Sequence, residues 1–528
     1  MRFQILLCIF GFLGWLAFAD PLWVRTYNGP YNDFDEIHAI GVDDSGNVIV
    51  SGFSGLSRYD DEFVTIKYRP NGDTAWLRHF NPGSGLDGAT ALAVDRAGNI
   101  IVTGYLGGST SEYGDWVTIK YSAAGELLWT AVYDLGDRDR PSCLAVDSAG
   151  NSYVTGQAGW LNDLDYVVVK YDPNGNEVWV FRYDGGYDDL SQALAVDGQD
   201  NIYVTGYAEL GGVDRALVTW KVGPSGESLW ANVYAGPAGT WLDGEEIATD
   251  GQGNVIVAGY AFDTLTVGDY LIVKYSPTGD TLWTRRYNGP GNRSDYVAGL
   301  ALDAAGNVYV TGTALFDPYR SNYVTVKYSP SGEQRWVARF IGPHQRDRAK
   351  GIALGAEADV YVCGEGVNLS GYWCAVTVKY DSAGNQQWVE RFASDFDEAE
   401  AYVITLSRQG MVYVGGRTDN DTNGLDYLTL AYGSAGAVTE KANAEAQRSS
   451  CVPTIVRGVL WLAGAGHNPI PAKESGLRPK PVLLDATGRK MMELIPGPND
   501  VSRLVPGVYF VSAPEAQGRL VNKVIVAR

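Results

Sequence analysis

Cysteine and histidine are scarce in this chain, which holds five cysteines and four histidines in 528 residues. Cysteines this few and scattered exclude a disulfide-rich scaffold, and so few histidines argue against a zinc centre. A calcium ion held by carboxylate and carbonyl oxygens stays compatible with the composition, and no other cofactor is expected. Cys363 ends one expected strand and Cys374 begins the next, so the two could form a disulfide across that hairpin or remain buried free thiols.

Positive charge is also in deficit, since 41 Lys and Arg stand against 62 Asp and Glu, for a net charge of −21. A nucleic acid or an anionic membrane needs a basic face, so neither is expected as the main partner. The sequence lacks GxSxG, HExxH, P-loop and dinucleotide-binding motifs. Catalysis therefore has no motif in its favour, although carboxylate, Tyr and Lys side chains from different repeats could still assemble an active site.

A long apolar run stands at the N-terminus, in residues 1–19. It follows Arg2 and ends at Ala17-Phe18-Ala19, the small-x-small pattern of a signal-peptidase site. We expect cleavage after Ala19, because the run is short for a membrane anchor and polar residues follow it. The protein is thus expected to be secreted or displayed on the outer cell surface, with no transmembrane segment once the signal is removed.

One sequence motif is abundant: ALAVDRAGNIIVTG at 91–104 is repeated in recognisable form through most of the chain. Its alternating apolar residues suit half-buried strands, and its Asp-x-x-Gly centre suits a tight turn, so each copy predicts a β-hairpin. Successive copies are 50–53 residues apart. The glycines that close the eight copies are Gly52, Gly104, Gly156, Gly206, Gly259, Gly312, Gly364 and Gly416.

Each copy continues into a third strand, such as VTIKY at 64–68, and a fourth that carries a Trp. Four strands in a unit of this length are typical of a β-propeller blade, so we expect an all-β fold with an eight-bladed β-propeller over residues 20–436. The first Trp strand, at 22–27, precedes the first copy, whereas the last copy ends at 428–432 without one. The N-terminal strand is expected to complete that last blade. A seven-bladed ring with one extruded repeat is the alternative.

The sequences GDWVTIKY, YDPNGNEVW and AVDxxGNxYVTG resemble the bacterial β-propeller repeat called SBBP, and the resemblance covers residues 22–432. It implies a propeller in an exported protein and says almost nothing about chemistry. The eighth copy departs most from the pattern, with Ser407 at the turn Asp and Ala431 at the Lys of the third strand.

A second region follows residues 437–455, whose Ala-, Ser- and Glu-rich composition predicts a linker. In residues 456–528, short apolar stretches separated by Gly and Pro predict a small β-sandwich. VLLDATGRKMMEL, LVPGVYFV and KVIVAR in this region resemble the type A C-terminal sorting domain of the type IX secretion system. The resemblance implies the secretion machinery as a partner of residues 456–528 and cleavage of the domain after export. A merely structural module is the alternative.

Two charged positions repeat along the copies. We expect the Asp residues to cap loops or to pair with the repeated Lys, since repetition usually marks packing; a ring of carboxylates that gathers cations is the alternative. The Asp position, eight residues before the turn, holds Asp35, Asp87, Asp139, Asp189, Asp295 and Asp347, with Asp243 displaced by one. The third-strand position holds Lys67, Lys120, Lys170, Lys221, Lys274, Lys327 and Lys379.

Another position, five residues before the turn, differs in every copy. It holds His38, Thr90, Ser142, Gln192, Glu245, Ala298, Lys350 and Tyr402. A symmetric scaffold becomes a specific site only by breaking its symmetry, although ordinary drift at a solvated position gives the same pattern. The predicted ligand-binding residues are His38, Gln192, Glu245, Lys350 and Tyr402 of this set, with Trp160, Trp241 and Trp373 in or beside irregular loops.

The expected function is a binding scaffold for an extracellular glycan, polymer or protein. A polysaccharide hydrolase or lyase that uses carboxylates on the loop face is one alternative, and a purely structural surface component is another. Calcium has one candidate site, the loop RTDNDTNGLDY at 417–427. Asp419, Asp421 and Asn423 open it as in an oxygen-ligand calcium loop, and Asp426 could replace the missing Glu. A metal-free turn held by its own Asp and Asn side chains is the alternative.

Overall fold

The structure is a computed structural model. It describes residues 21–433 except 58–59, 84, 109–110, 137, 161, 212–213, 264–266, 394–397 and 420–423, together with seven strands between 454 and 526. The chain divides into two compact units, Met1–Thr439 and Glu440–Arg528. The expected signal segment and most of the expected linker lie outside the described residues, and a strand begins at Thr454, inside the end of that linker.

Every described element is a strand, as expected for an all-β fold. In the first unit the strands are β1 Trp23–Tyr27, β2 Asp35–Val42, β3 Val48–Ser57, β4 Asp60–Tyr68, β5 Thr74–Phe80, β6 Gly88–Val94, β7 Ile100–Gly108, β8 Ser111–Tyr121, β9 Leu127–Tyr133, β10 Arg140–Val146, β11 Ser152–Trp160, β12 Asp163–Tyr171, β13 Glu177–Tyr183, β14 Asp189–Val196, β15 Ile202–Leu210, β16 Asp214–Val222, β17 Ser228–Tyr234, β18 Trp241–Thr249, β19 Val255–Phe262, β20 Asp269–Tyr275, β21 Thr281–Tyr287, β22 Asp295–Leu302, β23 Val308–Asp317, β24 Arg320–Tyr328, β25 Gln334–Phe340, β26 Arg348–Leu354, β27 Val360–Val367, β28 Trp373–Tyr380, β29 Gln386–Phe392, β30 Ala399–Leu406, β31 Val412–Asp419 and β32 Leu425–Tyr432.

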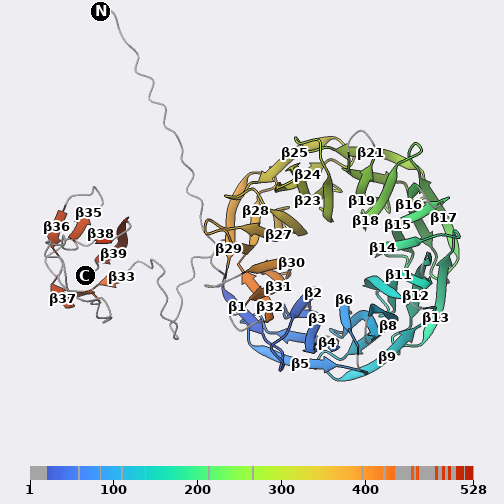
Figure 1. Cartoon of the computed structure of the whole chain (residues 1–528), viewed down its shortest axis with the longest axis horizontal. Coiled ribbons are helices and arrows are strands. Elements are labelled where there is room, and N and C mark those ends of the chain that lie inside the picture. Colours follow the sequence, from blue (N-terminus) through green and yellow to red (C-terminus); the bar gives the residue numbers. More distant parts are fainter. Residues whose placement is uncertain are drawn as a thin grey trace, which may run out of the picture. The chain divides into compact units, whose positions relative to one another are not determined.

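Consecutive groups of four strands form antiparallel sheets: β2–β5, β6–β9, β10–β13, β22–β25 and β26–β29. Strands β14–β17 and β18–β21 repeat the pattern but form one sheet, because a single parallel bridge joins Arg215 to Trp241. We number these groups repeats 1 to 7 in chain order, and β30–β32 belong to repeat 8. The sheets stand around a central axis with the first strand of each repeat innermost (Figure 1). This is a β-propeller arrangement, as the sequence predicts.

The N-terminal strand β1 pairs with β32, as the register of the copies predicts. The antiparallel ladder runs from Trp23 opposite Ala431 to Tyr27 opposite Tyr427. The eighth repeat therefore contains a four-stranded sheet in the order β1-β32-β31-β30, although its outer strand comes from the other end of the described chain.

An Asp holds the hairpin turn between the first and second strands in repeats 1 to 6. In the second repeat, Asp95 accepts hydrogen bonds from the N–H groups of Ala97 and Asn99, while Gly98 takes a positive φ of 79°. The buried Lys120 ammonium lies 3.0 Å from the same carboxylate. Burial favours the neutral acid, but hydrogen bonds from Asn99 and Lys120 hold the pKa of Asp95 below its usual range. In repeats 1, 2 and 5 the third-strand Lys thus pairs with the turn Asp and not with the Asp eight residues earlier, which corrects one of the two expectations.

Tryptophan side chains join neighbouring repeats through seven equivalent contacts. Trp23 donates its indole N–H to Pro70 O at 2.9 Å, and its ring covers Gly72. Gly72 has a φ of 85°, and a Cβ there would lie 2.9 Å from the ring, so both the backbone and the space require glycine. The same contact recurs at 2.9–3.2 Å from Trp76, Trp129, Trp179, Trp230, Trp283 and Trp336.

Of the two alternatives left open for the cysteine pair, the structure has two buried thiols and not a disulfide. Cys363 lies opposite Thr377 and Cys374 lies opposite Gly366. The odd spacing between Thr377 and Cys374 turns the two sulfurs to opposite faces of the sheet, where they pack in different core clusters. Both thiols are free, and Cys374 donates to Gly366 O at 3.1 Å.

The second unit contains two sheets. Its strands are β33 Thr454–Val456, β34 Val459–Leu462, β35 Val482–Asp485, β36 Lys490–Glu493, β37 Gly497–Asp500, β38 Gly507–Glu515 and β39 Gly518–Val526. Five strands pair in the order β33-β39-β38-β35-β36, and β34 pairs with β37. Across the described part of both units, no helix has the length and apolar character needed to cross a membrane.

We predict that deleting residues 22–27 weakens a segment almost 400 positions away in sequence. The deletion removes the ladder partner of β32 and the Trp23 contact with Pro70. Amide hydrogen exchange in residues 426–432 should therefore become faster by at least about tenfold, whereas β24 serves as the internal control. Unchanged protection in 426–432 would show that β1 does not support β32.

Candidate ligand-binding face

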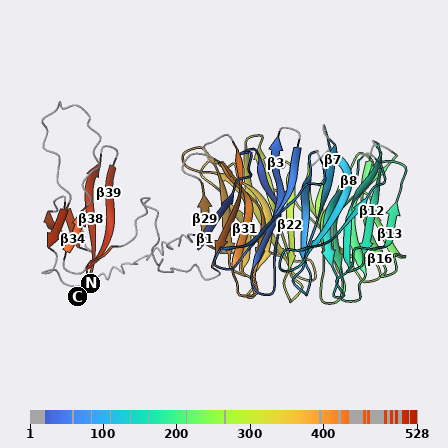
Figure 2. The same ribbon diagram turned by 90° about the horizontal axis from the view of Figure 1, so that it is seen from below.

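The strand directions gather the predicted residues on one face. In the first repeat, β2 begins where β3 ends, since Asp35 lies opposite Ser54, and β4 begins at the same edge. The loops between second and third strands and the loops that enter each repeat therefore share one face, which we call the loop face. Figure 2 shows the strands of the propeller running between its two faces.

The position that differs in every copy is a β-bulge. In each repeat the register between the first and second strands shifts at this residue, so it has no ladder partner. A bulge redirects a side chain without breaking the sheet. None of the eight side chains is part of the buried core. The bulge residues are His38, Thr90, Ser142, Gln192, Glu245, Ala298, Lys350 and Tyr402.

A charged network links the bulge residues of repeats 1 and 8. His38 Nε2 lies 3.0 Å from Glu36 Oε1. Arg417 on β31 bridges two carboxylates, at 2.7 Å from Glu36 Oε2 and 2.9 Å from Glu400 Oε2. Burial raises the pKa of Glu36, but His38 and Arg417 outweigh this effect and hold it below the usual range. At neutral pH the Glu36 carboxylate is therefore ionised and locks the Arg417 guanidinium in place.

The network continues into repeat 7. Tyr402 donates its hydroxyl proton to Glu400, and burial together with the nearby carboxylates raises the pKa of Tyr402 well above its usual value. Lys350 Nζ lies 5.8 Å from the centre of the Tyr402 ring and 3.9 Å from Glu365 Oε1. Three of the predicted residues, His38, Lys350 and Tyr402, thus belong to one connected group.

The fifth repeat gathers carboxyl groups instead. Asp243, Glu245 and Glu246 all come from β18, and burial is the main reason that their pKa values are raised. The charge of Glu245 adds to the effect on both neighbours, and the pKa of Glu246 reaches about 7. Part of this cluster is therefore protonated at neutral pH and could donate protons.

A cavity of about 610 Å³ opens on the loop face beside repeats 1 to 4. Four bulge residues line it, together with Arg138, Arg140, Asp188 and Tyr207. Ser142 already donates to Ser191 O at 2.9 Å, and Thr90 donates to Thr103 O at 3.3 Å. The side chain of Gln192, in contrast, makes no hydrogen bond to any residue that the structure describes. Its amide can therefore meet a ligand without first breaking an internal contact.

The three predicted loop tryptophans lie on the same face but not together. Trp160 ends β11 and is 55% exposed, while Trp241 begins β18 and is 44% exposed. The Arg215 guanidinium lies 5.3 Å from the Trp241 ring centre. Trp373 begins β28, half-buried, with the Arg348 guanidinium 5.2 Å from its ring. Each is thus available to a ligand in a different repeat.

The repeated Asp residues cap loops, which confirms the structural expectation. Asp35 accepts from Gly29 N at 2.6 Å and Asp347 from Gly342 N at 2.6 Å, in both cases from the loop that enters the repeat. These carboxyl groups are buried, and burial raises the pKa of Asp35, Asp87, Asp189 and Asp347 to about 6 and that of Asp295 to about 7.

Calcium binding at 417–427 stays a prediction. Asp421 and Asn423 lie outside the described residues. Asp419 ends β31 and donates its N–H to Glu398 O at 2.8 Å, while Asp426 is buried in β32. Elsewhere, the carboxylates of Asp115, Asp134 and Asp139 lie within 4.8 Å of one another. Asp139 already accepts from Leu135 N and Gly159 N, so loop capping explains its position without a metal.

Arginines on this face were not among the predicted residues. Arg138 and Arg140 flank the capping Asp of repeat 3, and Arg346 and Arg348 flank that of repeat 7. The signal was present in the sequence as the tripeptide Arg-Asp-Arg at 138–140 and again at 346–348. In an acidic chain, the recurrence of this tripeptide beside a loop is a departure from the average composition that points to the loop face.

Comparison with known proteins supports the repeat and the fold. Residues 282–320 match the family model of the SBBP β-propeller repeat. The matched stretch runs from β21 to the start of β24. A comparison with curated proteins found no match.

Among solved structures, Sqt1 from Chaetomium thermophilum gives a TM-score of 0.50 at 12% identity, over 79% of this chain and 99% of that one. The polysaccharide lyase Uly1 gives 0.43 at 10% identity, over 77% and 91%. The β-propeller domain of the Trilobed protease from Pyrococcus furiosus gives 0.37 at 11% identity, over 70% and 98%. At such identities, likeness concerns the fold alone.

We predict that the propeller becomes less stable as the pH rises from about 4 to about 7. The pKa of five capping Asp residues is about 6 to 7 in the folded state and near 3.8 in the unfolded chain. Their stabilising effect is therefore complete below pH 3.8 and is lost as the pH rises through the folded value. The five are Asp35, Asp87, Asp189, Asp295 and Asp347. The melting temperature should fall by on the order of 5 °C between pH 5 and pH 7.

The variant Asp295→Asn tests whether ionisation of the capping Asp causes this loss of stability. The amide oxygen of Asn can still accept from Gly289 N, but the side chain cannot ionise. This variant should show a smaller fall, while Asp280→Asn at an exposed turn should behave as the unmodified protein does. A fall that is identical in all three proteins would assign the pH dependence to other groups.

Proposed function

We propose that the protein is an extracellular binding scaffold whose loop face holds a glycan or another polymer. The observation that carries the proposal is the bulge in each repeat, which frees one residue from the ladder and gives it a different side chain in every copy. Four of these residues line the 610 Å³ cavity, which is large enough for one or two sugar rings.

We infer that the propeller is a closed ring of eight blades. Each repeat supplies one four-stranded set, with β1 as the outer strand of the last. The inner strands pack in succession, and β30 packs against β2. Trp23 of β1 also reaches the turn of repeat 1 through Pro70. These contacts favour closure between the first and last repeats over a ring with one extruded copy.

We infer that the protein is exported through residues 456–528 and is then secreted or displayed on the outer surface. The support is the signal-peptide pattern at 1–19 and the sorting-domain pattern, which includes LVPGVYFV and KVIVAR.

The intact mass of protein recovered from culture medium or the cell surface tests this export. We expect a chain that begins at Asp20, with the C-terminal unit removed. Material recovered from whole-cell extract before export should retain the C-terminal unit. A secreted chain that starts at Met1 would contradict the inference.

A polysaccharide hydrolase or lyase is the second candidate, favoured by two groups on the loop face. The carboxyl cluster of β18 contains acids with raised pKa values, which suits proton donation near neutral pH. Lys350, Tyr402 and Arg417 place cationic and phenolic groups in the network of repeats 7 and 8. Turnover of a bound polymer that is lost in Glu245→Gln or Lys350→Met would favour this function.

We predict that a glycan array identifies a ligand and that Gln192→Ala weakens its binding about tenfold. The expected loss corresponds to one hydrogen bond of about 1.4 kcal/mol. Gln387→Ala is the matched control, because Gln387 is exposed near the opposite face and hydrogen-bonds Asp381. Equal affinity in both variants would exclude the cavity as the site. The absence of any glycan ligand would leave a protein partner or a purely structural role.

A further inference from the structure

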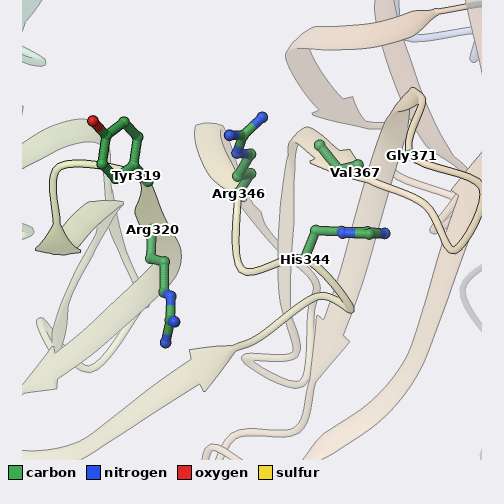
Figure 3. Close-up of a pocket in the computed structure, with 6 residues that line it drawn as sticks. All are labelled: Tyr319, Arg320, His344, Arg346, Val367 and Gly371. Carbon is green, nitrogen blue, oxygen red and sulfur yellow. The ribbon is translucent and has the colours of Figure 1, made fainter.

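A groove lies on the loop face where repeats 6 and 7 meet. Its main cavity has a volume of about 380 Å³, and a second of about 180 Å³ adjoins it through shared lining residues. In Figure 3, Arg346 lies between Tyr319 and Arg320 on one side and His344, Val367 and Gly371 on the other. Arg348 and Trp373 line the adjoining cavity. Cationic and aromatic side chains thus dominate this part of a strongly acidic protein.

The repeat pattern shows a reversal of charge at this junction. Seven residues before the third-strand Lys, repeats 1, 3 and 4 hold Asp60, Asp163 and Asp214. The carboxylates of Asp60 and Asp214 accept from the N–H of the following loop, from Gly85 at 3.2 Å and Gly239 at 2.9 Å. The same position in repeat 6 is Arg320. A residue that serves folding elsewhere has therefore been replaced by the opposite charge here.

Backbone contacts hold the loop at this junction, as they do at the junction of repeats 1 and 2, where Asp61 N donates to Gly85 O at 2.8 Å. Ser321 N donates to Gln345 O at 2.7 Å, and Asp347 N donates to Ser321 O at 2.9 Å. This bridge fixes Arg346 beside Arg320. The Arg346 guanidinium is exposed and makes no hydrogen bond or ion pair with any residue in the described part of the chain. The corresponding residue is the uncharged Phe34 at the junction of repeats 8 and 1 and the uncharged Leu86 at the junction of repeats 1 and 2, whereas it is Arg138 at the junction of repeats 2 and 3.

The neighbouring carboxylates neutralise the groove only in part. Arg320 lies 3.4 Å from Asp317, and more than half of its side chain is exposed. Arg348 lies 3.1 Å from the buried Glu365 and extends over Trp373, so it is held in position. Asp317 and Glu365 each pair with one of the three guanidinium groups, whereas the buried carboxylate of Asp347 accepts from Gly342 N. Guanidinium groups form paired hydrogen bonds with sulfate and carboxylate oxygens.

We propose that this groove binds the sulfate or carboxylate groups of an anionic glycan. The proposal rests on the glycan-binding function above and names the class of glycan. Tyr319 is 76% exposed beside the arginines and offers a flat apolar surface for a sugar ring. Glu365 contacts both Arg348 and Lys350, so the groove adjoins the network of bulge residues. A sugar chain can follow this line from the groove toward the centre of the loop face.

Calorimetric titration of the full chain with dextran sulfate, polygalacturonate and unmodified dextran tests the proposal. We expect binding of at least one anionic polymer and none of dextran. Arg346→Gln should weaken binding about tenfold. Arg320→Asp should weaken it further, and it should still fold because it installs the residue type that repeats 1 and 4 carry. Arg335→Gln is the matched control, since Arg335 is an exposed arginine of the same sheet at its opposite end.

The response to each polymer decides between the sources of the anion. Preference for dextran sulfate assigns sulfate, and preference for polygalacturonate assigns carboxylate. Binding that survives both groove variants, or single-stranded DNA that binds as tightly as either glycan, would overturn the proposal. If the glycan array instead identifies a neutral glycan whose binding depends on Gln192 but not on Arg346, the groove is not the binding site, although the proposed glycan-binding function remains supported. No glycan binding at all would overturn both.

Discussion

The propeller depends on the contact between the fourth-strand Trp of one repeat and the glycine turn of the next. The indole needs a hydrogen-bond acceptor when it is covered, and the turn carbonyl supplies one. The glycine must remain because a Cβ would meet the ring. Trp388 is the exception: the eighth repeat takes its outer strand from β1, so no continuous turn follows, and its indole nitrogen is buried without a hydrogen-bond partner in the described residues. Leaving such a donor unpaired costs about 1–3 kcal/mol.

Most repeated positions have a structural role, so few positions in each repeat are free to recognise a ligand. The turn Asp, the third-strand Lys and the capping Asp each hold local structure, so a change at any of them breaks contacts within the fold. The bulge residue has no ladder partner, and in each repeat it can change without loss of strand pairing. Its variation from His38 to Tyr402 is therefore what a recognition surface requires, and the same freedom permits a residue such as Ala298 that recognises little.

The repeat in the sequence made the strands predictable, because nearly every copy contains the same hairpin pattern followed by the same Trp-containing strand. It also predicted β1 beside β32, since the copies start out of register. Side-chain partners were harder. The sequence could not decide whether Cys363 and Cys374 form a disulfide. That depends on the strand register, which places the two side chains on opposite faces of the sheet. The Lys partner was misassigned for a related reason: sequence distance does not show that Lys120 returns to the hairpin turn at Asp95. The bulge could not be predicted from the sequence, because it is a property of the pairing between two strands.

The distribution of charge is compatible with the proposed binding of an anionic polymer to this acidic protein. Many of its carboxylates already have partners within the fold. They form ion pairs with third-strand lysines or accept hydrogen bonds from loop amides. The remaining negative surface repels a polyanion, but salt screens this repulsion beyond about 8 Å under physiological conditions. At closer range, the arginines that flank the capping Asp of repeat 7 act on whatever group lies between them. Long-range repulsion combined with short-range attraction favours a polymer whose anionic groups match the spacing of Arg320 and Arg346 and disfavours polyanions that cannot reach them.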